Sequence, residues 1–521
     1  MTNSFQHAFV TDALPTSHAL INDANSPDEI YAVFDKITYE KGGALLYMIY
    51  NAIGAEKFKT WMRAYFNKYQ YSNADTHQLF EVMKSTGVLN IDMNLVSAWT
   101  YKPGFPIVQV TEPRSGVIRL SQSRFLSRQP AKNETLESYL WWIPITVKSN
   151  TGTIQRYDMT SGTLEIPVSS SPNDWFKLNN DQTAFYRVNY PLRMWELLFE
   201  QVDNNHNQLS TSDRFGLVDD LFALGFAGHL KLADALRLIF AIEDESANVV
   251  WSAVFGYLNK LDSLISRDAI YGGFKRMVLK LIENKYEELG WDKRPTDTEE
   301  DQLLRISILS AATKYGMTDA IDTALARYRA LQNGSITCDD SGVRSVLYRT
   351  FVSQSGEVGY YEMLHKYTRA VDQSDASEIP ITLYALAYAT EPPLLKTTLE
   401  FSLNKYVQTS QETIYLIREV GNNPVGNALA WDFVRDSYEA LTTKVNKRVV
   451  AYYGLIPGLS SGFSTKTKYD EVNAFFERTK GDSSFKVVHE TLENILVNEH
   501  LMKTNYVELK AYLERDFPPV L

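Results

Sequence analysis

The chain has a single cysteine, Cys338, so it has no pair that could form an intrachain disulfide. One thiol in 521 residues is typical of a reducing compartment, and we predict a cytoplasmic location. No apolar run is long enough to span a bilayer, and the N-terminus lacks the basic and apolar regions of a secretion signal. The sequence therefore predicts no membrane segment.

Positive charge is also in short supply, with 52 Lys and Arg against 63 Asp and Glu and a net charge of -11. This balance argues against a nucleic-acid groove or a face for anionic membranes. There is no Gly-Lys dipeptide and so no P-loop. Hydrophobic residues at 44% and charged residues at 22% describe an ordinary globular chain, and the length favours about three or four domains.

Hydrophobic periodicity divides the chain into three parts. Residues 1–101 favour helices, with a loop at 11–18, a helix start at 26–29 and a capping pair of Asp75 with Gln78. In residues 102–190 the period changes to two, and a small antiparallel β-sandwich is expected from five short strands, at 107–110, 117–120, 142–147, 163–166 and 185–188.

Residues 191–521 show no strand pattern. Helices of about 11 to 16 residues with short turns favour a stacked α-solenoid of the HEAT or armadillo kind. The clearest predicted helices are 212–228, 232–242, 250–261, 304–315 and 321–331.

One segment, residues 34–49, forms a turn that runs into a helix. Apolar side chains from Leu45 onward recur at the spacing of one buried helix face. We expect Gly42 and Gly43 to let another backbone come close at the start of this helix. Taken alone, the segment is interpreted as an ordinary buried helix with Tyr39 in front of it.

The residues around Tyr39 favour a catalytic role for it. The run Phe34-Asp35-Lys36-Ile37-Thr38-Tyr39-Glu40-Lys41-Gly42-Gly43 resembles the F-D-x-I-[ST]-Y-x-K-G-[AG] segment of the gluzincin aminopeptidases, the family of aminopeptidase N, the puromycin-sensitive enzyme and the endoplasmic reticulum aminopeptidases. The resemblance implies that the Tyr39 phenol donates a hydrogen bond to the oxyanion formed when zinc-bound water attacks the peptide carbonyl. One such donor is worth about two to three powers of ten in rate.

The likeness continues in collinear order along nearly the whole chain. It includes the loop at 12–18 and the stretch 99–106, which is similar to the exit from the family's catalytic domain. Further matches are Trp142-Ile143-Pro144, Phe185 to Tyr190, Asp213-Arg214, Asp219-Asp220, Asn423-Pro424 and Glu493 to Leu496.

The family's metal site is missing from the sequence. The H-E-x-x-H helix, the second glutamate and the G-x-M-E-N strand do not occur, and no two histidines stand four apart among His7, His18, His77, His206, His229, His365, His489 and His500. Such a site needs three protein ligands and an open position for water. The family uses one zinc. Because the ligands for it are absent here, we expect this chain to hold no cofactor and to begin after the point where the family carries those ligands.

That expectation has a consequence for packing. With the zinc-bearing half absent, some apolar positions around Leu45, Met48, Phe58, Trp61 and Tyr65 are predicted to face water.

Four other patterns receive plain structural interpretations. His489 with Glu493 provides only two ligands on one helix face, and Gly458-x-Ser460-x-Gly462 lacks the strand that a nucleophile elbow needs. Cys338 has no evident partner base. The glycosylation patterns at Asn133 and Asn333 are interpreted as chance.

The sequence thus predicts a multidomain, mainly α protein. Residues 1–101 are the helical remnant of a thermolysin-like lobe, 102–190 the β-sandwich and 191–521 the solenoid. The predicted function is the C-terminal portion of a zinc aminopeptidase that removes N-terminal residues from peptides, inactive alone. Peptides or a complementary catalytic lobe are the predicted partners, without nucleic acid. A non-catalytic peptide- or protein-binding module stays open as the alternative, as does a targeting segment in the missing N-terminal part.

Overall fold

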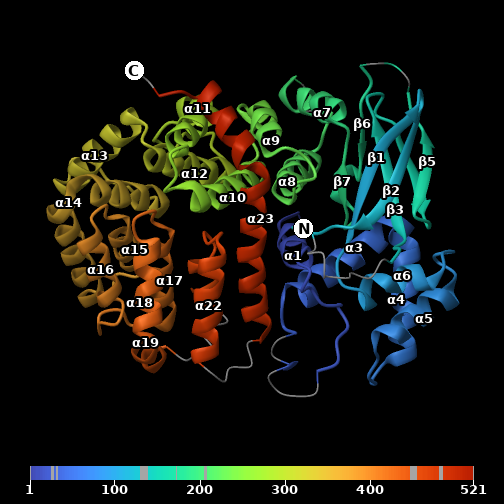
Figure 1. Cartoon of the computed structure of the whole chain (residues 1–521), viewed down its shortest axis with the longest axis horizontal. Coiled ribbons are helices and arrows are strands. Elements are labelled where there is room, and N and C mark those ends of the chain that lie inside the picture. Colours follow the sequence, from blue (N-terminus) through green and yellow to red (C-terminus); the bar gives the residue numbers. More distant parts are fainter. Residues whose placement is uncertain are drawn as a thin grey trace. The chain divides into compact units, whose positions relative to one another are not determined.

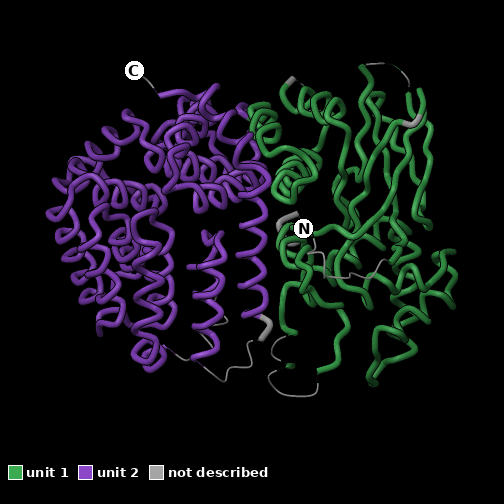
Figure 2. The backbone as a smooth tube through the Cα atoms, viewed as in Figure 1, with its two compact units in different colours: residues 1–242 green, residues 243–521 purple. Residues whose placement is uncertain are grey.

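The chain folds into two compact units, residues 1–242 and 243–521 (Figure 2). The computed structural model describes residues 2–24, 29–30, 33–129, 139–169, 171, 173–204, 208–445, 455–479 and 485–519. The predicted helix start at 26–29 and the pattern at Asn133 lie wholly or mostly outside these residues. The predicted division at 101/102 and 190/191 stays a prediction.

The first unit begins with helices, which confirms the prediction for its N-terminal part (Figure 1). They are α1 (Thr2–Asp12), the π-helical turn η1 (Ile37–Lys41), α3 (Gly42–Ile53), α4 (Ala55–Tyr69), α5 (Thr76–Thr86) and α6 (Met93–Tyr101). The predicted capping pair is present, because the Asp75 carboxylate accepts from the Gln78 amide and the Gln78 side chain accepts from the Asp75 amide. The loop predicted from residue 11 starts only after Asp12, where α1 ends.

Some of five apolar positions are expected to face water, and two of them do so in part. Leu45, Met48 and Trp61 are buried, whereas Phe58 and Tyr65 are half-buried. Trp61 is covered by α5, which packs on α4, and by the ring of Phe58, which meets it edge to face. The Trp61 indole also donates to the Leu79 carbonyl of α5, 3.1 Å away.

Among the described residues, seven strands follow and form two sheets of the first unit. They are β1 (Pro106–Arg114), β2 (Val117–Arg124), β3 (Ile143–Ser149), β4 (Ile154–Met159), β5 (Thr163–Pro167), β6 (Phe176–Leu178) and β7 (Arg187–Asn189). The four-stranded sheet has the order β5-β2-β1-β7, and the three-stranded sheet has the order β4-β3-β6.

The antiparallel prediction is wrong for one strand pair, because β1 and β7 run parallel and make the larger sheet mixed. Strands β4 and β6 were not predicted. β4 is an edge strand whose side chains are mostly exposed, so it shows no alternation of apolar residues, and β6 is only three residues long.

The first unit ends with α7 (Leu192–Asn204), α8 (Thr211–Ala227), α9 (Leu232–Leu238) and the 3-10 turn η3 (Ile239–Ile242). A buried ionic cluster ties α8 to the sheet. Arg187 of β7 lies 2.8 Å from carboxylate oxygens of both Asp219 and Asp220, and the Val188 amide donates to Asp220. Gln6 of α1 donates to Asp219 at 3.0 Å, so the cluster joins three segments that are distant in the sequence.

The second unit is helical throughout its described residues, with no strand among them. It comprises α10 (Asn248–Ile265), α11 (Tyr271–Leu289), α12 (Glu299–Tyr315), α13 (Thr318–Gln332), α14 (Ser341–Asp372), α15 (Glu378–Ala385), η4 (Leu386–Tyr388), α16 (Pro392–Phe401), α17 (Ser410–Asn422), α18 (Asn427–Asp436), α19 (Tyr438–Lys444), α21 (Leu455–Leu459), α22 (Lys466–Arg478) and α23 (Phe485–Asp516).

Successive helices of this unit pack on one another, as α11 does on α12 and α14 on α15. The helices predicted at 304–315 and 321–331 are present, but they start earlier than predicted because their first turns are polar; α12 begins after a capping box of Thr298 with Asp301. α14 exceeds the predicted length, and Gly356, with φ of 56°, interrupts it.

The ionic cluster predicts a pH dependence of stability. Burial raises the pKa of the Asp220 carboxyl to about 6, against the pull of Arg187 and with the repulsion of Asp219. The folded state then binds a proton that the unfolded state releases between about pH 4 and 6, so the free energy of unfolding falls as pH rises through this window, by up to about 1.4 kcal/mol per pH unit.

We expect Asp220→Asn to remove this contribution. The difference in unfolding free energy between the native chain and the variant should shrink from pH 4 to pH 7 in urea titrations. Glu112→Gln, at an exposed position of β1, controls for the loss of a carboxylate. Parallel pH profiles of the native chain and Asp220→Asn would contradict the prediction.

Candidate active-site turn

Tyr39 lies in the middle of η1, the π-helical turn that leads directly into α3. Its side chain is 62% exposed, and its ring lies 6.3 Å from the ring of Phe34. In the part of the chain that the structure describes, the Tyr39 hydroxyl has no hydrogen-bond partner. The phenol is therefore available as a donor to a group from outside the chain.

Asp35 fixes the start of the turn. Its carboxylate oxygen Oδ1 accepts from the Thr38 amide at 2.9 Å, and its backbone carbonyl accepts from the Tyr39 amide at 3.1 Å. The other carboxylate oxygen, Oδ2, lies 2.8 Å from Nε2 of His18. The Asn22 side chain also lies against the other ring nitrogen of His18.

Lys41 fixes the end of the turn through a fully buried ion pair. Its ammonium lies 2.8 Å from Oδ2 of Asp12 and donates to the Gly104 carbonyl at 2.9 Å. Asp12 accepts in turn from the Gly104 amide at 2.8 Å and from the Ser17 hydroxyl at 2.6 Å. α1, η1 and the connection from α6 to β1 thus meet at one charge pair.

The two glycines after Lys41 do not serve the close approach that their sequence position suggested. A Cβ atom on Gly43 would meet nothing within 4 Å, and one on Gly42 would meet only the Leu20 side chain at 3.5 Å. Gly104 is the residue that needs to be glycine, because its φ is 84° and a Cβ atom there would lie 2.4 Å from Nε of Arg124.

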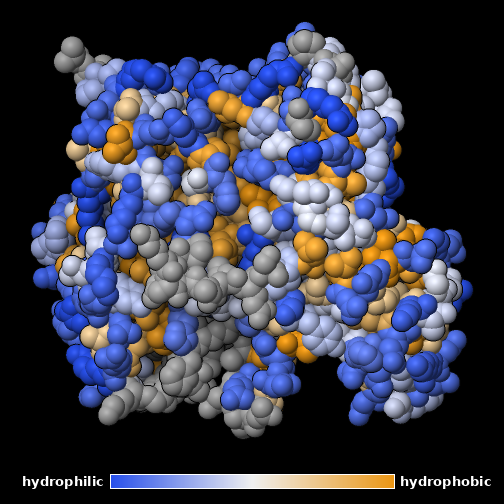
Figure 3. All heavy atoms as spheres, turned by 45° about the vertical axis from the view of Figure 1, so that its right-hand side comes forward, coloured by the Kyte–Doolittle hydropathy of each residue, from blue (hydrophilic) through white to orange (hydrophobic). Residues whose placement is uncertain are grey.

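An apolar stripe continues from Tyr39 along the outer face of α3. Tyr39, Gly43, Leu46 and Tyr50 follow the spacing of one helix face, and Leu46 and Tyr50 are 42% and 41% exposed. Hydrophobic side chains reach the surface over the N-terminal helices (Figure 3). We call these four residues the α3 stripe. The Tyr50 ring meets the Phe58 ring of α4 edge to face at 5.4 Å, and the three large side chains of the stripe all stay exposed.

The side chains that the structure describes do not fit a resident zinc ion. Among the described residues, no group of three His, Cys, Asp or Glu side chains is placed to hold a metal. His489 and Glu493 lie on α23. Ser460 is no elbow nucleophile, since it follows the short helix α21 and its hydroxyl donates to the Ile456 carbonyl at 3.0 Å. Burial raises the pKa of the Cys338 thiol, which keeps it a poor nucleophile.

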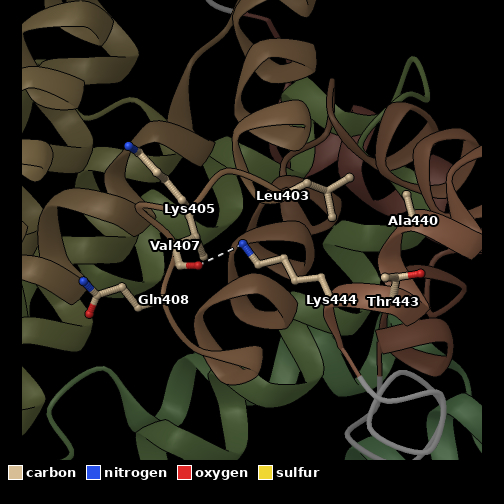
Figure 4. Close-up of a pocket in the computed structure, with 7 residues that line it drawn as sticks. All are labelled: Leu403, Lys405, Val407, Gln408, Ala440, Thr443 and Lys444. Carbon is tan, nitrogen blue, oxygen red and sulfur yellow. Dashed lines mark hydrogen bonds between the residues drawn. The ribbon is translucent and has the colours of Figure 1, made fainter.

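A hollow of about 710 Å³ lies in the second unit (Figure 4). The Lys444 ammonium is engaged there by the carbonyls of Asn404 and Val407, at 2.6 and 2.8 Å, and burial lowers its pKa. No catalytic grouping results from the residues that line the hollow, which are Leu403, Lys405, Val407, Gln408, Ala440, Thr443 and Lys444.

Comparison with known proteins shows the family of this chain. The profile described as "Peptidase family M1 domain" matches residues 1–99, and the profile described as "ERAP1-like C-terminal domain" matches residues 175–497. The chain belongs to the M1 aminopeptidase family, and it corresponds to the C-terminal portion of its members. The family resemblance predicted from the Tyr39 segment is therefore confirmed.

Three relatives illustrate the match. Aminopeptidase A of Gloydius brevicauda is 28% identical over 98% of this chain and 53% of its own length. The thyrotropin-releasing hormone-degrading ectoenzyme of Homo sapiens is 29% identical over 95% of this chain and 48% of its own. Aminopeptidase M1-A of Oryza sativa subsp. japonica is 28% identical over 96% of this chain and 56% of its own. The chain spans about half the length of these relatives.

Sequence reasoning singled out Tyr39, whose role stays a prediction, but missed the residues that hold its turn. The matching sequence segments contained these residues, but no role was predicted for them; they are Asp12, His18, Asp35 and Lys41. The one signal was the joint presence of the loop at 12–18 and the Tyr39 segment, whose side chains the fold brings together.

The buried pair predicts a strong effect of Lys41 on stability. Lys41→Met leaves the Asp12 carboxylate buried without a counter-charge, which costs about 3–5 kcal/mol. We expect urea unfolding of the first unit to show this loss. Lys36→Met changes an exposed lysine of the same segment and should alter stability little. A loss below about 1 kcal/mol for Lys41→Met would mean that the pair is dispensable.

Proposed function

We propose that this chain is the C-terminal portion of a zinc aminopeptidase that removes N-terminal residues from peptides, and that it hydrolyses no peptide alone. The observation that carries the proposal is the Tyr39 turn, fixed at both ends with an exposed phenol between. Tyr39 is the catalytic residue of this chain. Its hydroxyl donates to the oxyanion that develops on the peptide carbonyl.

A complementary catalytic lobe is the proposed partner, and it packs on the α3 stripe. Large apolar side chains such as Leu46 and Tyr50 lose contact with water when such a lobe covers them. The same packing brings the substrate carbonyl to Tyr39, which lies on this face. The metal ligands that this sequence lacks belong to that lobe, in the same polypeptide or in another one.

The finer domain picture belongs to the same proposal. Residues 1–101 are the helical part of a peptidase domain, 102–190 a β-sandwich and 191–521 an α-solenoid. The matches at 1–99 and 175–497 support the first and the last of these. The comparisons do not favour the alternative of a non-catalytic binding module.

We propose a cytoplasmic location for the chain. The proposal rests only on its single cysteine, since few cysteines are typical of a reducing compartment. Within the described residues, none of the helices combines the length and the apolarity needed to cross a membrane.

The isolated chain should bind no stoichiometric zinc and release no chromophore from leucine p-nitroanilide, because the family's ligand set is missing from its sequence. Metal analysis of the purified chain checks the first part and a spectrophotometric assay the second. About one tightly held zinc per chain, together with activity that a chelator removes, would refute the proposal. An in-frame H-E-x-x-H in the genomic sequence directly upstream would place the ligands in the same polypeptide.

When the chain is joined to a zinc-bearing lobe, the peptidase activity of the complex should depend on the Tyr39 phenol. Tyr39→Phe removes the donor and keeps the ring, so kcat should fall by about two to three powers of ten while the lobe still binds. The assay uses the full chain co-expressed with the zinc-bearing lobe of a family relative. Tyr101→Phe makes the same chemical change at an exposed position of α6, outside the α3 stripe, and should leave kcat near that of the native chain. Equal turnover of Tyr39→Phe and Tyr101→Phe would show that Tyr39 has no catalytic part.

A further inference from the structure

Packing does not hold the Tyr39 side chain in place. Its ring is exposed, and Phe34, the one ring that lies near it among the described residues, is itself 62% exposed. The direction of the phenol must therefore come from the backbone of η1. Whatever fixes that backbone also fixes the donor.

Asp35 makes three of the contacts that define this backbone. Oδ1 accepts the Thr38 amide, the carbonyl accepts the Tyr39 amide, and Oδ2 faces His18, each within 3.1 Å. The amides of Thr38 and Tyr39 both point to Asp35, so this residue orients the two peptide units on the N-terminal side of the tyrosine side chain.

His18 restrains the carboxylate that does this work. Its Nε2 carries the hydrogen that Oδ2 of Asp35 accepts, at 2.8 Å, and the side chains of both residues are only 18% exposed. Asp35 therefore has little freedom to rotate away from the Thr38 amide. A clamp of this kind differs from an exposed helix cap such as that of Asp75, whose carboxylate faces solvent.

We propose that Asp35 is a positioning residue for Tyr39, which it serves by holding the start of η1 rather than by touching substrate. The inference rests on the proposed function and deepens it. Removing the carboxylate leaves the Lys41 anchor intact, so the chain folds while the phenol loses its direction. A displacement of about 1 Å at a reacting group costs on the order of 100-fold in rate.

Two aspartates of the first unit allow a matched test. Asp35→Ala and Asp75→Ala each remove a side-chain acceptor for an amide three residues later, at 2.9 and 2.8 Å. Asp35→Ala should lower the urea midpoint at least as much as Asp75→Ala, because it also removes the contact with His18. In the co-expressed complex, Asp35→Ala should lower kcat by about 10- to 100-fold with KM changed less than about twofold, whereas Asp75→Ala should leave both unchanged. Asp35→Asn keeps an acceptor for Thr38 and should restore most of kcat.

Amide hydrogen exchange of the full chain gives a readout that needs no activity. Asp35→Ala should speed exchange of the Thr38 and Tyr39 amides about tenfold or more, and Asp75→Ala should not. Unchanged exchange in Asp35→Ala overturns the inference. Normal kcat in Asp35→Ala beside a slow Tyr39→Phe overturns it as well and leaves the proposed function standing. Normal kcat in Tyr39→Phe overturns the proposed function, and the role of Asp35 with it.

Discussion

The buried pair of Asp12 and Lys41 is the interaction on which the rest of the first unit depends. Two opposite charges without contact to water are stable only together and only when their remaining hydrogen bonds are made. Gly104 meets this condition, because its amide donates to Asp12 and its carbonyl accepts from Lys41. The end of α1, the tyrosine turn and the entrance to the first sheet must therefore be formed at the same time.

The same use of charge recurs where the sheet meets α8. Arg187 faces two adjacent carboxylates in a site closed to solvent, and its guanidinium also lies 4.4 Å from the centre of the Phe9 ring. Buried charges tolerate displacement less well than apolar side chains, because each must keep its partner at a fixed distance. These charge contacts add to an aromatic core, in which Phe9 of α1 stacks on Phe185 at 4.2 Å next to β7.

Local sequence patterns were enough to predict secondary-structure elements and to single out the Tyr39 segment. The helix periods, the Asp75 cap and the Tyr39 segment are all contained within short windows, and each is present in the structure. The Lys41 anchor is different, since Asp12 and Gly104 are separated by 92 positions and a lysine in a polar run looks like a solvated side chain. The parallel partner of β1 is also 80 residues away, so hydrophobic alternation could not reveal its direction. Contacts of this range become visible only in the fold.

The exposure of Tyr39 has a consequence for when this chain can act. A hydrogen bond to a developing negative charge is weak in bulk water, where the dielectric constant is about 80 and solvent competes for both partners, and far stronger in a dry cleft. In the first unit alone the phenol stands in the former environment. In the proposed role, the phenol therefore gains its effect on the rate from the partner that covers it. The first unit alone holds the donor without the dry surroundings that would make it effective.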